Sequence, residues 1–257
     1  MTPKLFIATP MYGGMCFGPY VQSIMNLQTV LQGHGWPTMI SFMFNESLIT
    51  RARNSLTHNF LKTDCTHLMF IDSDIRFEAQ QVPPMVAADV PILCGIYPKK
   101  EISWGMVRRG MEAGVPDDQL KYWTGSFVVN LVGYVGETTV PTDKPCEIWQ
   151  GGTGFMLIKR EVFEALAPHT PSYKSDVVDL SGQIGQGEEI KEYFATSIEP
   201  GTKRLLSEDY HFCYQYRTKC DGKVYAAPWV QLAHCGTYFF EGRMIQNADD
   251  NRNSSNV

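Results

Sequence analysis

The chain has 257 residues, of which 44% are hydrophobic and 19% are charged. This composition excludes a disordered or collagen-like chain, and the length suits one large α/β domain or two small ones. The net charge of -5 argues against indiscriminate coating of nucleic acid, because that mode needs a basic surface. Seven cysteines without a C-x-x-C pair indicate reduced thiols, and no run reaches the ~20 apolar residues of a membrane span. We therefore expect a soluble, cytoplasmic protein.

Strands and helices are predicted to alternate over the first hundred residues. Apolar runs predict four strands, at 4–9, 38–44, 67–71 and 90–97. Apolar residues at helical spacing predict a helix over 18–32 and a second one on the stripe Leu48, Ala52, Leu56 and Phe60. Such alternation predicts a mainly parallel central sheet with helices on its faces.

The second half of the chain is less regular. Strands are predicted at 126–132, 155–158, 224–227 and 230–233, and helices at 160–166 and 208–217. The polar segment 243–257 is expected to be a frayed C-terminal tail.

Two carboxylates, in Asp72-Ser73-Asp74, follow the third predicted strand directly. Ligands of open parallel sheets bind at the carboxyl ends of the strands, and carboxylate oxygens suit Mg²⁺ or Mn²⁺. An ordinary polar turn explains this short string equally well.

Two further segments combine glycine or acidic residues with a nearby element. The run WQGGTGF at 149–155 precedes a strand, and its glycines would either let backbone approach a ligand or form a tight turn. It has neither the Lys-Ser/Thr of a P-loop nor the spacing of a dinucleotide fingerprint. Glu208 and Asp209 open a helix, where acidic residues also serve capping and the helix dipole.

The order of these pieces resembles the GT-A glycosyltransferases. FIDSD, GGTGF, SED at a helix start and a late strand ending in His234-Cys235-Gly236 follow one another over roughly residues 4–240. The likeness is to family-2-like enzymes, and LCGIYPKKEISW is similar to the stand-alone versions of tailed phages and large viruses. The resemblance implies one α/β domain of GT-A type over 1–242, in which about 1–100 binds the nucleotide and about 101–242 faces the acceptor. The location would be the host cytoplasm if the chain is viral.

The resemblance also implies roles for individual residues. Asp72 and Asp74 match the D-x-D motif that holds the metal, and His234 matches a histidine that completes the metal shell. Asp209 matches the base of inverting members, with Glu208 the next candidate. The residues expected to bind the donor are Thr9, Pro10, Tyr12, Arg51, Arg53, Asn54, Asp72 and Lys99. Those expected on the acceptor side are Trp149, Gly152, Thr153 and Gly154.

The chemistry of these residue types agrees with the implied reaction. A divalent ion stabilises the charge that grows on a diphosphate leaving group, and an imidazole ligand favours Mn²⁺ over Mg²⁺. A carboxylate can take the proton of the acceptor hydroxyl. Because the N–H groups of a helix start favour the ionised form, we expect the pKa of Asp209 to be depressed.

The sequence thus predicts a metal-dependent, inverting hexosyl- or pentosyltransferase that uses a nucleotide sugar. The acceptor would be a glycan, or a hydroxymethylated base in phage DNA if the basic and aromatic residues Lys99, Lys100, Arg108, Arg109 and Trp104 meet DNA rather than solvent. The alternative is a non-catalytic sugar-nucleotide or glycan-binding module on the same scaffold, against which the intact set Asp72, Asp74, Asp209 and His234 argues. His234 by itself could also be an ordinary core histidine. A nucleotidyltransferase is disfavoured, because no glycine-rich phosphate loop with Arg or Lys lies near the N-terminus.

Overall fold

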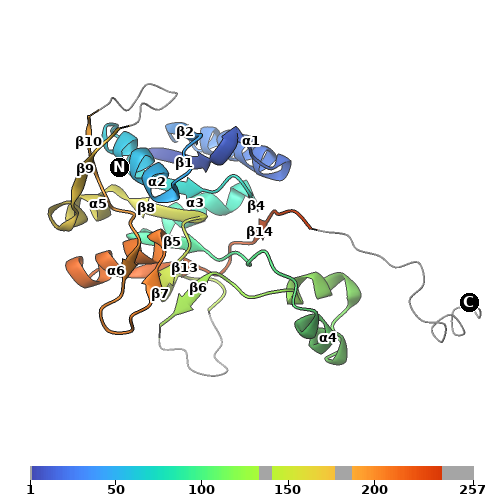
Figure 1. Cartoon of the computed structure of the whole chain (residues 1–257). Coiled ribbons are helices and arrows are strands. Elements are labelled where there is room, and N and C mark those ends of the chain that lie inside the picture. The colour runs from blue at the N-terminus through green and yellow to red at the C-terminus, as the bar shows by residue number, and fades with distance from the viewer. Residues whose placement is uncertain (1, 133–140, 177–186, 239–257) are drawn as a thin grey trace, which may run out of the picture.

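The computed structural model describes residues 2–132, 141–176 and 187–238 (Figure 1). A central sheet of eight strands has the order β2-β1-β3-β8-β5-β13-β7-β6. Its strands are β1 (Leu5–Met11), β2 (Thr38–Phe44), β3 (His67–Ile71), β5 (Ile92–Gly95), β6 (Val129–Leu131), β7 (Cys146–Gly151), β8 (Phe155–Lys159) and β13 (Val224–Ala227).

Most strands of this sheet run in one direction. Parallel pairing joins β1 to β2 and to β3, and also β5 to β13. Strand β8 lies antiparallel between β3 and β5, and β7 is antiparallel to β13 and to β6, so only β7 and β8 oppose the others. The predicted fold class, a mainly parallel sheet flanked by helices, is confirmed, with β8 as an antiparallel insertion between the parallel strands.

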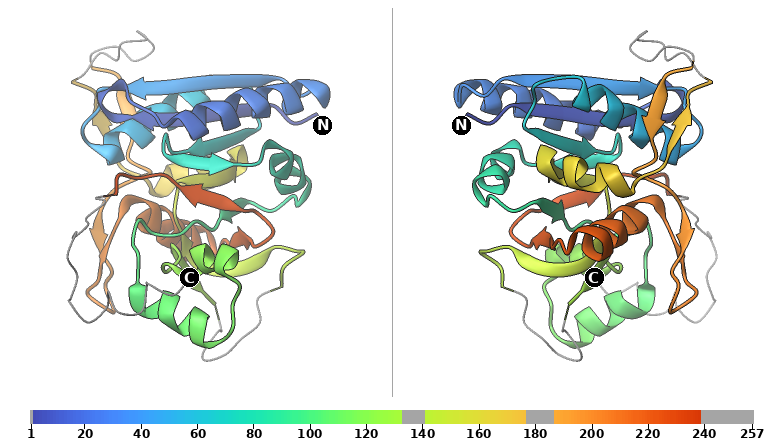
Figure 2. Two further views of the ribbon diagram at one scale, coloured as in Figure 1. Left: turned by 90° about the vertical axis from the view of Figure 1, so that its right-hand side faces the viewer. Right: turned by 90° about the vertical axis from the view of Figure 1, so that its left-hand side faces the viewer.

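Helices cover both faces of the sheet (Figure 2). One face packs against α2 (Ile49–Leu61), α5 (Arg160–Leu166) and α6 (Glu208–Cys220), and the other against α1 (Gly18–Gly33) and α3 (Val82–Ala87). Residues of β1 alternate between the two cores, with Phe6 and Ala8 on the first and Leu5 and Ile7 on the second. Because both faces are buried, this strand is a continuous apolar run in the sequence.

Shorter elements surround the sheet. Strand β4 (Ile75–Phe77) pairs with β14 (Leu232–His234), β9 (Ser172–Lys174) with β10 (Glu189–Lys191), and β11 (Ser197–Ile198) with β12 (Leu205–Leu206). Helix α4 (Trp104–Glu112) and the 3-10 helix η3 (Asp117–Trp123) form an arm that projects from the sheet (Figure 1). The other 3-10 helices are η1 (Tyr12–Gly14), η2 (Ala79–Gln81) and η4 (Ala167–His169). Among the described helices none is long and apolar enough to cross a membrane.

Several predicted elements have the observed bounds, and others differ for a physical reason. Strands β2, β3 and β13 and helix α5 begin and end as predicted. The predicted glycine-rich loop is shorter, because Trp149–Gly151 continue strand β7, in which Gln150 and Gly151 pair with β6. The predicted strand at 230–233 starts at Leu232 and pairs with β4 outside the central sheet. The predicted tail at 243–257 lies outside the described residues.

Candidate active site

The turn Asp72-Ser73-Asp74 lies at the carboxyl end of β3, where two backbone hydrogen bonds fix it. The Asp72 N–H donates to the Gly154 carbonyl at 2.9 Å, and the Cys235 N–H donates to the Asp74 carbonyl at 2.7 Å. The first bond connects the turn to the glycine loop before β8, and the second connects it to the end of β14. Segments far apart in the chain therefore converge on the two predicted carboxylates.

Arg53 is a buried cation that holds two carboxylates of the site. Its Nη2 donates to Asp72 Oδ1 at 3.0 Å and its Nε donates to Glu208 Oε1 at 3.2 Å, while the side chain is only 3% exposed. Burial alone lowers the pKa of Arg53, but Asp72 and Glu208 outweigh it and raise that pKa. Helix α2 and helix α6 are thus joined at the end of β3 by one guanidinium.

Asp209, the predicted base, is oriented by hydrogen bonds to one of its oxygens. The Ser207 hydroxyl and the Tyr210 N–H, the latter at 2.8 Å, both donate to Oδ1. Burial, followed by the charge of Glu208, raises the pKa of Asp209. The predicted depression was wrong, because the carboxylate is desolvated beside a like charge and these effects exceed the contribution of the helix start.

His234 faces Asp74 across a short gap. Its Nδ1 lies 2.9 Å from the Pro98 carbonyl, which can only accept, so Nδ1 carries the proton in that bond. The other ring nitrogen, Nε2, lies 3.5 Å from Asp74 Oδ1. Asp74 Oδ1 is buried without a hydrogen-bond partner, whereas Lys100 binds Oδ2. Burial raises the pKa of Asp74, but contacts with His234 and Lys100 bring it below the ordinary value.

This pair meets two requirements of a metal site. A ligating histidine commonly donates its other N–H to a backbone carbonyl, as His234 does to Pro98, and the orphaned Asp74 oxygen lacks a cation or donor. The predicted set of three ligands is not assembled, because Asp72 turns toward Arg53. Over residues 2–132, 141–176 and 187–238, no three His, Cys, Asp or Glu side chains are grouped to hold a metal ion. Asp74 and His234 fit a divalent ion as two of its ligands.

Tyr97 also lies at this site, although no sequence pattern indicated it. Its hydroxyl oxygen accepts from the Gly154 N–H at 3.1 Å, and a Cβ at Gly152 would lie 2.0 Å from that oxygen. The glycines therefore leave room for the Tyr97 ring and for the placing of Asp72. Gly152, Thr153 and Gly154 are buried, and their contact with the acceptor stays a prediction. The pattern of glycines indicated a close approach, but only the fold shows that Tyr97 makes it.

Three predicted donor-binding residues are used within the protein. The Asn54 amide is 1% exposed and exchanges hydrogen bonds with the Phe194 backbone at 2.9 and 2.8 Å, so it stabilises a loop. The buried Thr9 hydroxyl bonds to the Tyr20 hydroxyl at 2.7 Å. The Arg51 guanidinium, unlike that of Arg53, is paired with Glu46 and lies near Asp176. These three side chains do not contact Asp72, and their assignment to the donor stays a prediction.

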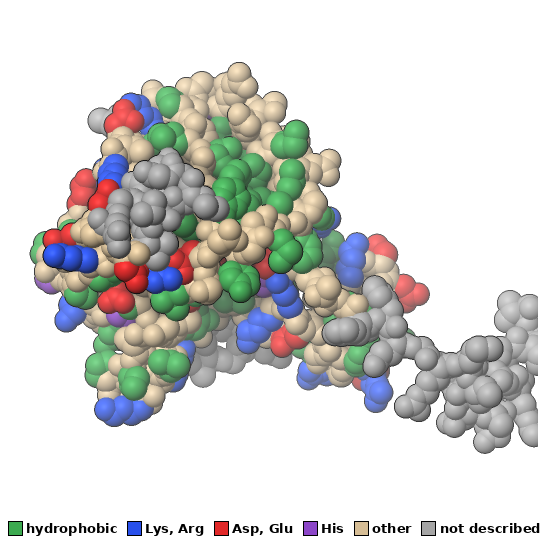
Figure 3. Space-filling view, turned by 45° about the horizontal axis from the view of Figure 1, so that its top comes forward, with side chains coloured by type: hydrophobic (Ala, Val, Ile, Leu, Met, Phe, Trp, Pro, Cys, Tyr) green, Lys and Arg blue, Asp and Glu red, His purple; other side chains and the backbone are tan. Residues whose placement is uncertain are grey.

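The end of β1 offers an exposed apolar surface near the site. Pro10 is partly exposed in β1, and Tyr12 is exposed in η1 directly after it. Other exposed apolar residues of this region are Met15, Phe42, Phe44 and Leu48. Figure 3 shows hydrophobic side chains gathered on the face that includes β1 and β2. The predictions for Pro10 and Tyr12 remain compatible with this exposure.

The remaining predicted residues are distributed differently from the expectation. Lys100, rather than Lys99, reaches Asp74, while the Lys99 N–H bonds to the Ser126 carbonyl. The predicted DNA-binding cluster is therefore not a single free basic surface, because one of its lysines, Lys100, binds the Asp74 carboxylate. Trp149 is half-exposed on β7 under the Arg217 guanidinium, which lies 4.3 Å from its ring centre, and lines a separate cavity of about 390 Å³.

Comparison with protein-family models gives no match, and comparison with curated proteins gives no significant match. Among solved structures, A197 from STIV is similar at 15% identity and a TM-score of 0.47, over 91% of this chain and 86% of that chain. GalNAc-T7 with UDP, GalNAc and Mn²⁺ is similar at 9% identity and 0.45, over 91% and 44%. A glycosyltransferase involved in the glycosylation of the major capsid of PBCV-1 is similar at 7% and 0.32, over 63% of each chain. These similarities are distant and concern the fold alone.

Proposed function

We propose that this chain is a metal-dependent glycosyltransferase, which moves a hexosyl or pentosyl group from a nucleotide sugar to an acceptor hydroxyl with inversion. The observation that carries the proposal is the meeting of two arrangements at the ends of β3 and β14. One is the cluster of Asp72, Glu208 and Asp209 around Arg53, and the other is the Asp74–His234 pair. Together they offer a base and an anion-rich edge that suits a cation.

Asp209 is the proposed base for the acceptor. Both of its hydrogen bonds are made to Oδ1, which leaves Oδ2 to accept the proton of the incoming hydroxyl. Its raised pKa makes this carboxylate a stronger base than an ordinary aspartate. As the acceptor oxygen attacks the anomeric carbon, its proton moves to Asp209 and the bond to the diphosphate breaks on the opposite side of the sugar.

Asp74 and His234 are the proposed protein ligands of a divalent ion. When bound, such an ion supplies a Lewis acid for the negative charge of the leaving diphosphate. The His234 nitrogen favours Mn²⁺ over Mg²⁺. Arg53 holds Asp72 and Glu208 in place, and Pro10 and Tyr12 offer an apolar surface to the nucleotide at the end of β1.

The test combines a panel of nucleotide sugars with Mn²⁺ and simple glycoside acceptors, and follows the product by NMR at the anomeric position. We expect transfer with inversion, loss of transfer in EDTA, and a loss of about 10²–10⁴-fold in kcat for Asp209→Asn with donor affinity retained. Asp221→Asn, an exposed aspartate at the other end of α6, is the matched control and should keep wild-type kcat.

Two results would contradict the proposal. Tight donor binding without turnover, unchanged by Asp209→Asn, would identify the non-catalytic binding module. Retention of the anomeric configuration, or wild-type kcat in Asp209→Asn, would remove Asp209 as the base of an inverting displacement.

A further inference from the structure

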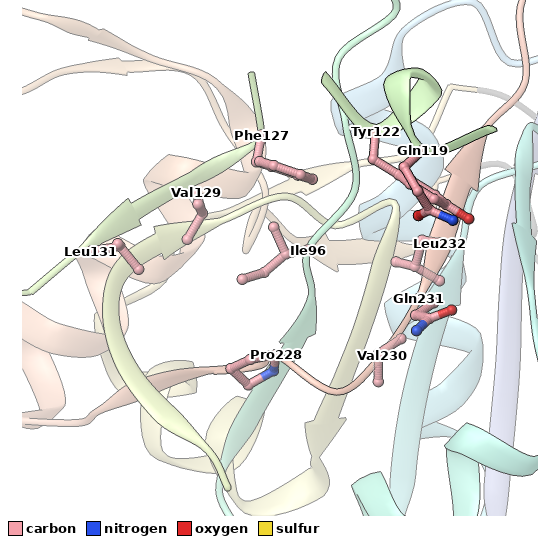
Figure 4. Close-up of a pocket in the computed structure, with 10 residues that line it drawn as sticks. All are labelled: Ile96, Gln119, Tyr122, Phe127, Val129, Leu131, Pro228, Val230, Gln231 and Leu232. Atoms are coloured by element: carbon pink, nitrogen blue, oxygen red, sulfur yellow. The ribbon is translucent and has the colours of Figure 1, made fainter. Parts of the chain in front are cut away.

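A second feature of this edge is a cavity of about 640 Å³ beside the candidate active site (Figure 4). Its size lies within the range of pockets that hold a drug-sized ligand. The walls come from the residue after β5, from β6 and the segment before it, from the segment before β14 with the first residue of that strand, and from η3. The arm of α4 and η3 thus contributes one side of a binding-sized space.

The described residues that line the cavity are all uncharged. Ile96, Phe127, Val129, Leu131 and Leu232 are among its apolar residues. Its polar lining residues are Gln119, Tyr122 and Gln231, and Figure 4 shows them on the side of Leu232, away from Leu131. A phosphate or other charged group would lose its hydration in such a space without gaining a partner of opposite charge. The chemistry suits an uncharged group with an apolar body.

The cavity shares its wall with the site of Asp74 and His234. Leu232 and His234 are two residues apart on β14, so their side chains lie on the same face of that strand. Pro98, whose carbonyl binds His234, forms a β-bridge with Phe127 of the cavity. A molecule that reaches Asp209 and the leaving group can therefore extend an apolar part along this wall.

From this juxtaposition we propose that the cavity binds an uncharged alkyl or aryl group carried by the acceptor. This inference rests on the proposed function, because only a transferase has an acceptor. The substrate class it names is a hydroxyl compound joined to an apolar group, rather than a bare sugar. Burial of the apolar part would position the hydroxyl at the site, because binding energy from a remote part of a substrate can orient its reacting part.

The experiment measures binding of methyl, butyl and hexyl β-D-glucoside to the full chain by calorimetry, below their micelle-forming concentrations. Each buried methylene should tighten binding about fourfold, so we expect hexyl β-D-glucoside to bind at least about 100-fold more tightly than the methyl compound. Phe127→Ala should reduce this ratio by about tenfold. Phe127 is 53% exposed, so its removal leaves the core intact, and thermal unfolding checks the fold.

Trp104→Ala is the matched control, because Trp104 is an aromatic residue of similar exposure, 65%, that does not line the cavity. It should leave the chain-length ratio unchanged. Equal affinity for the three glucosides would overturn the proposal, and so would the same loss in both variants. The binding measurement needs no donor, so a chain-length effect without any sugar transfer would refute the proposed reaction and leave the cavity assignment standing.

Discussion

Replacement of Arg53 by methionine tests the electrostatic arrangement of the site most directly. The substitution keeps an apolar stem over the Phe70 ring, from which the guanidinium lies 5.2 Å, and removes the charge. Asp72 and Glu208 then lose the cation that holds them, and Asp209 loses a charge that lowers its pKa. Three carboxylates would face one another without their buried counter-ion.

The expected cost follows from how deeply the partners are buried. Removing one member of a buried ion pair costs about 3–5 kcal/mol. Glu208 is 14% exposed and Asp72 is 29% exposed, so water partly relieves the remaining charges and the lower end applies. We expect a loss of about 3 kcal/mol in the free energy of unfolding. In a chain of this length that corresponds to a fall in Tm of roughly 6–12 °C.

The assay is thermal unfolding of Arg53→Met at pH 7.5, with Arg51→Met as control. Arg51 lies on the same helix and also binds a carboxylate, that of Glu46, but its side chain is 31% exposed. The Glu46 side chain is 8% exposed, but it keeps the Leu48 N–H as a hydrogen-bond donor, and the Arg51 guanidinium is already partly solvated. The control should therefore lose less stability than Arg53→Met, and the two variants compare a buried and a partly exposed arginine on one helix.

The stability that Arg53→Met loses relative to wild type should depend on pH, and this dependence can refute the reasoning. The variant suffers from ionised carboxylates without a counter-ion, so its deficit should shrink as pH falls toward about 4, where carboxylates take up protons. If Arg53→Met loses no more stability than Arg51→Met, or if its deficit grows on acidification, the Arg53 contacts do not have the role assigned to them.

Three further outcomes are expected. Folding raises the pKa of Asp209, so between the ordinary pKa of about 4 and the folded pKa the folded chain binds more protons than the unfolded chain. The free energy of unfolding therefore falls as the pH rises through this interval. Asp209→Asn should therefore be more stable than wild type at pH 7, with the difference vanishing at acidic pH, and equal Tm profiles would contradict the raised pKa. Mn²⁺ at 100 times its Kd should stabilise the chain by about 2.7 kcal/mol, and the shift in Tm should disappear in His234→Ala; a shift that survives this change would place the ion elsewhere. Gly152→Ala should cost about 1–3 kcal/mol because the new methyl meets the Tyr97 hydroxyl, whereas Gly201→Ala meets no atom within 4 Å and should leave the urea midpoint almost unchanged.

Local patterns in the sequence were sufficient for much of the fold. Strands β2 and β3 are apolar runs between polar or turn residues, and α5 is a short amphipathic repeat, so each was predicted with its observed bounds. The position of Asp72 and Asp74 after β3, and of Asp209 at the start of α6, followed from the same patterns. Hydrophobic periodicity and turn-forming residues depend only on neighbours in the chain. The sequence alone therefore determined these elements and the positions of these carboxylates.

Only the tertiary structure decided which side chains meet and in what charge state. Arg51 and Arg53 are two positions apart on α2, and no local signal distinguishes them, yet the fold gives one to Glu46 and the other to Asp72. Local reasoning predicted a lowered pKa for Asp209, and burial beside Glu208 raises it. Desolvation, the approach of Tyr97 to the glycine loop and the cavity beside β14 depend on segments that are distant in the chain, so they exist only once the sheet has brought those segments together.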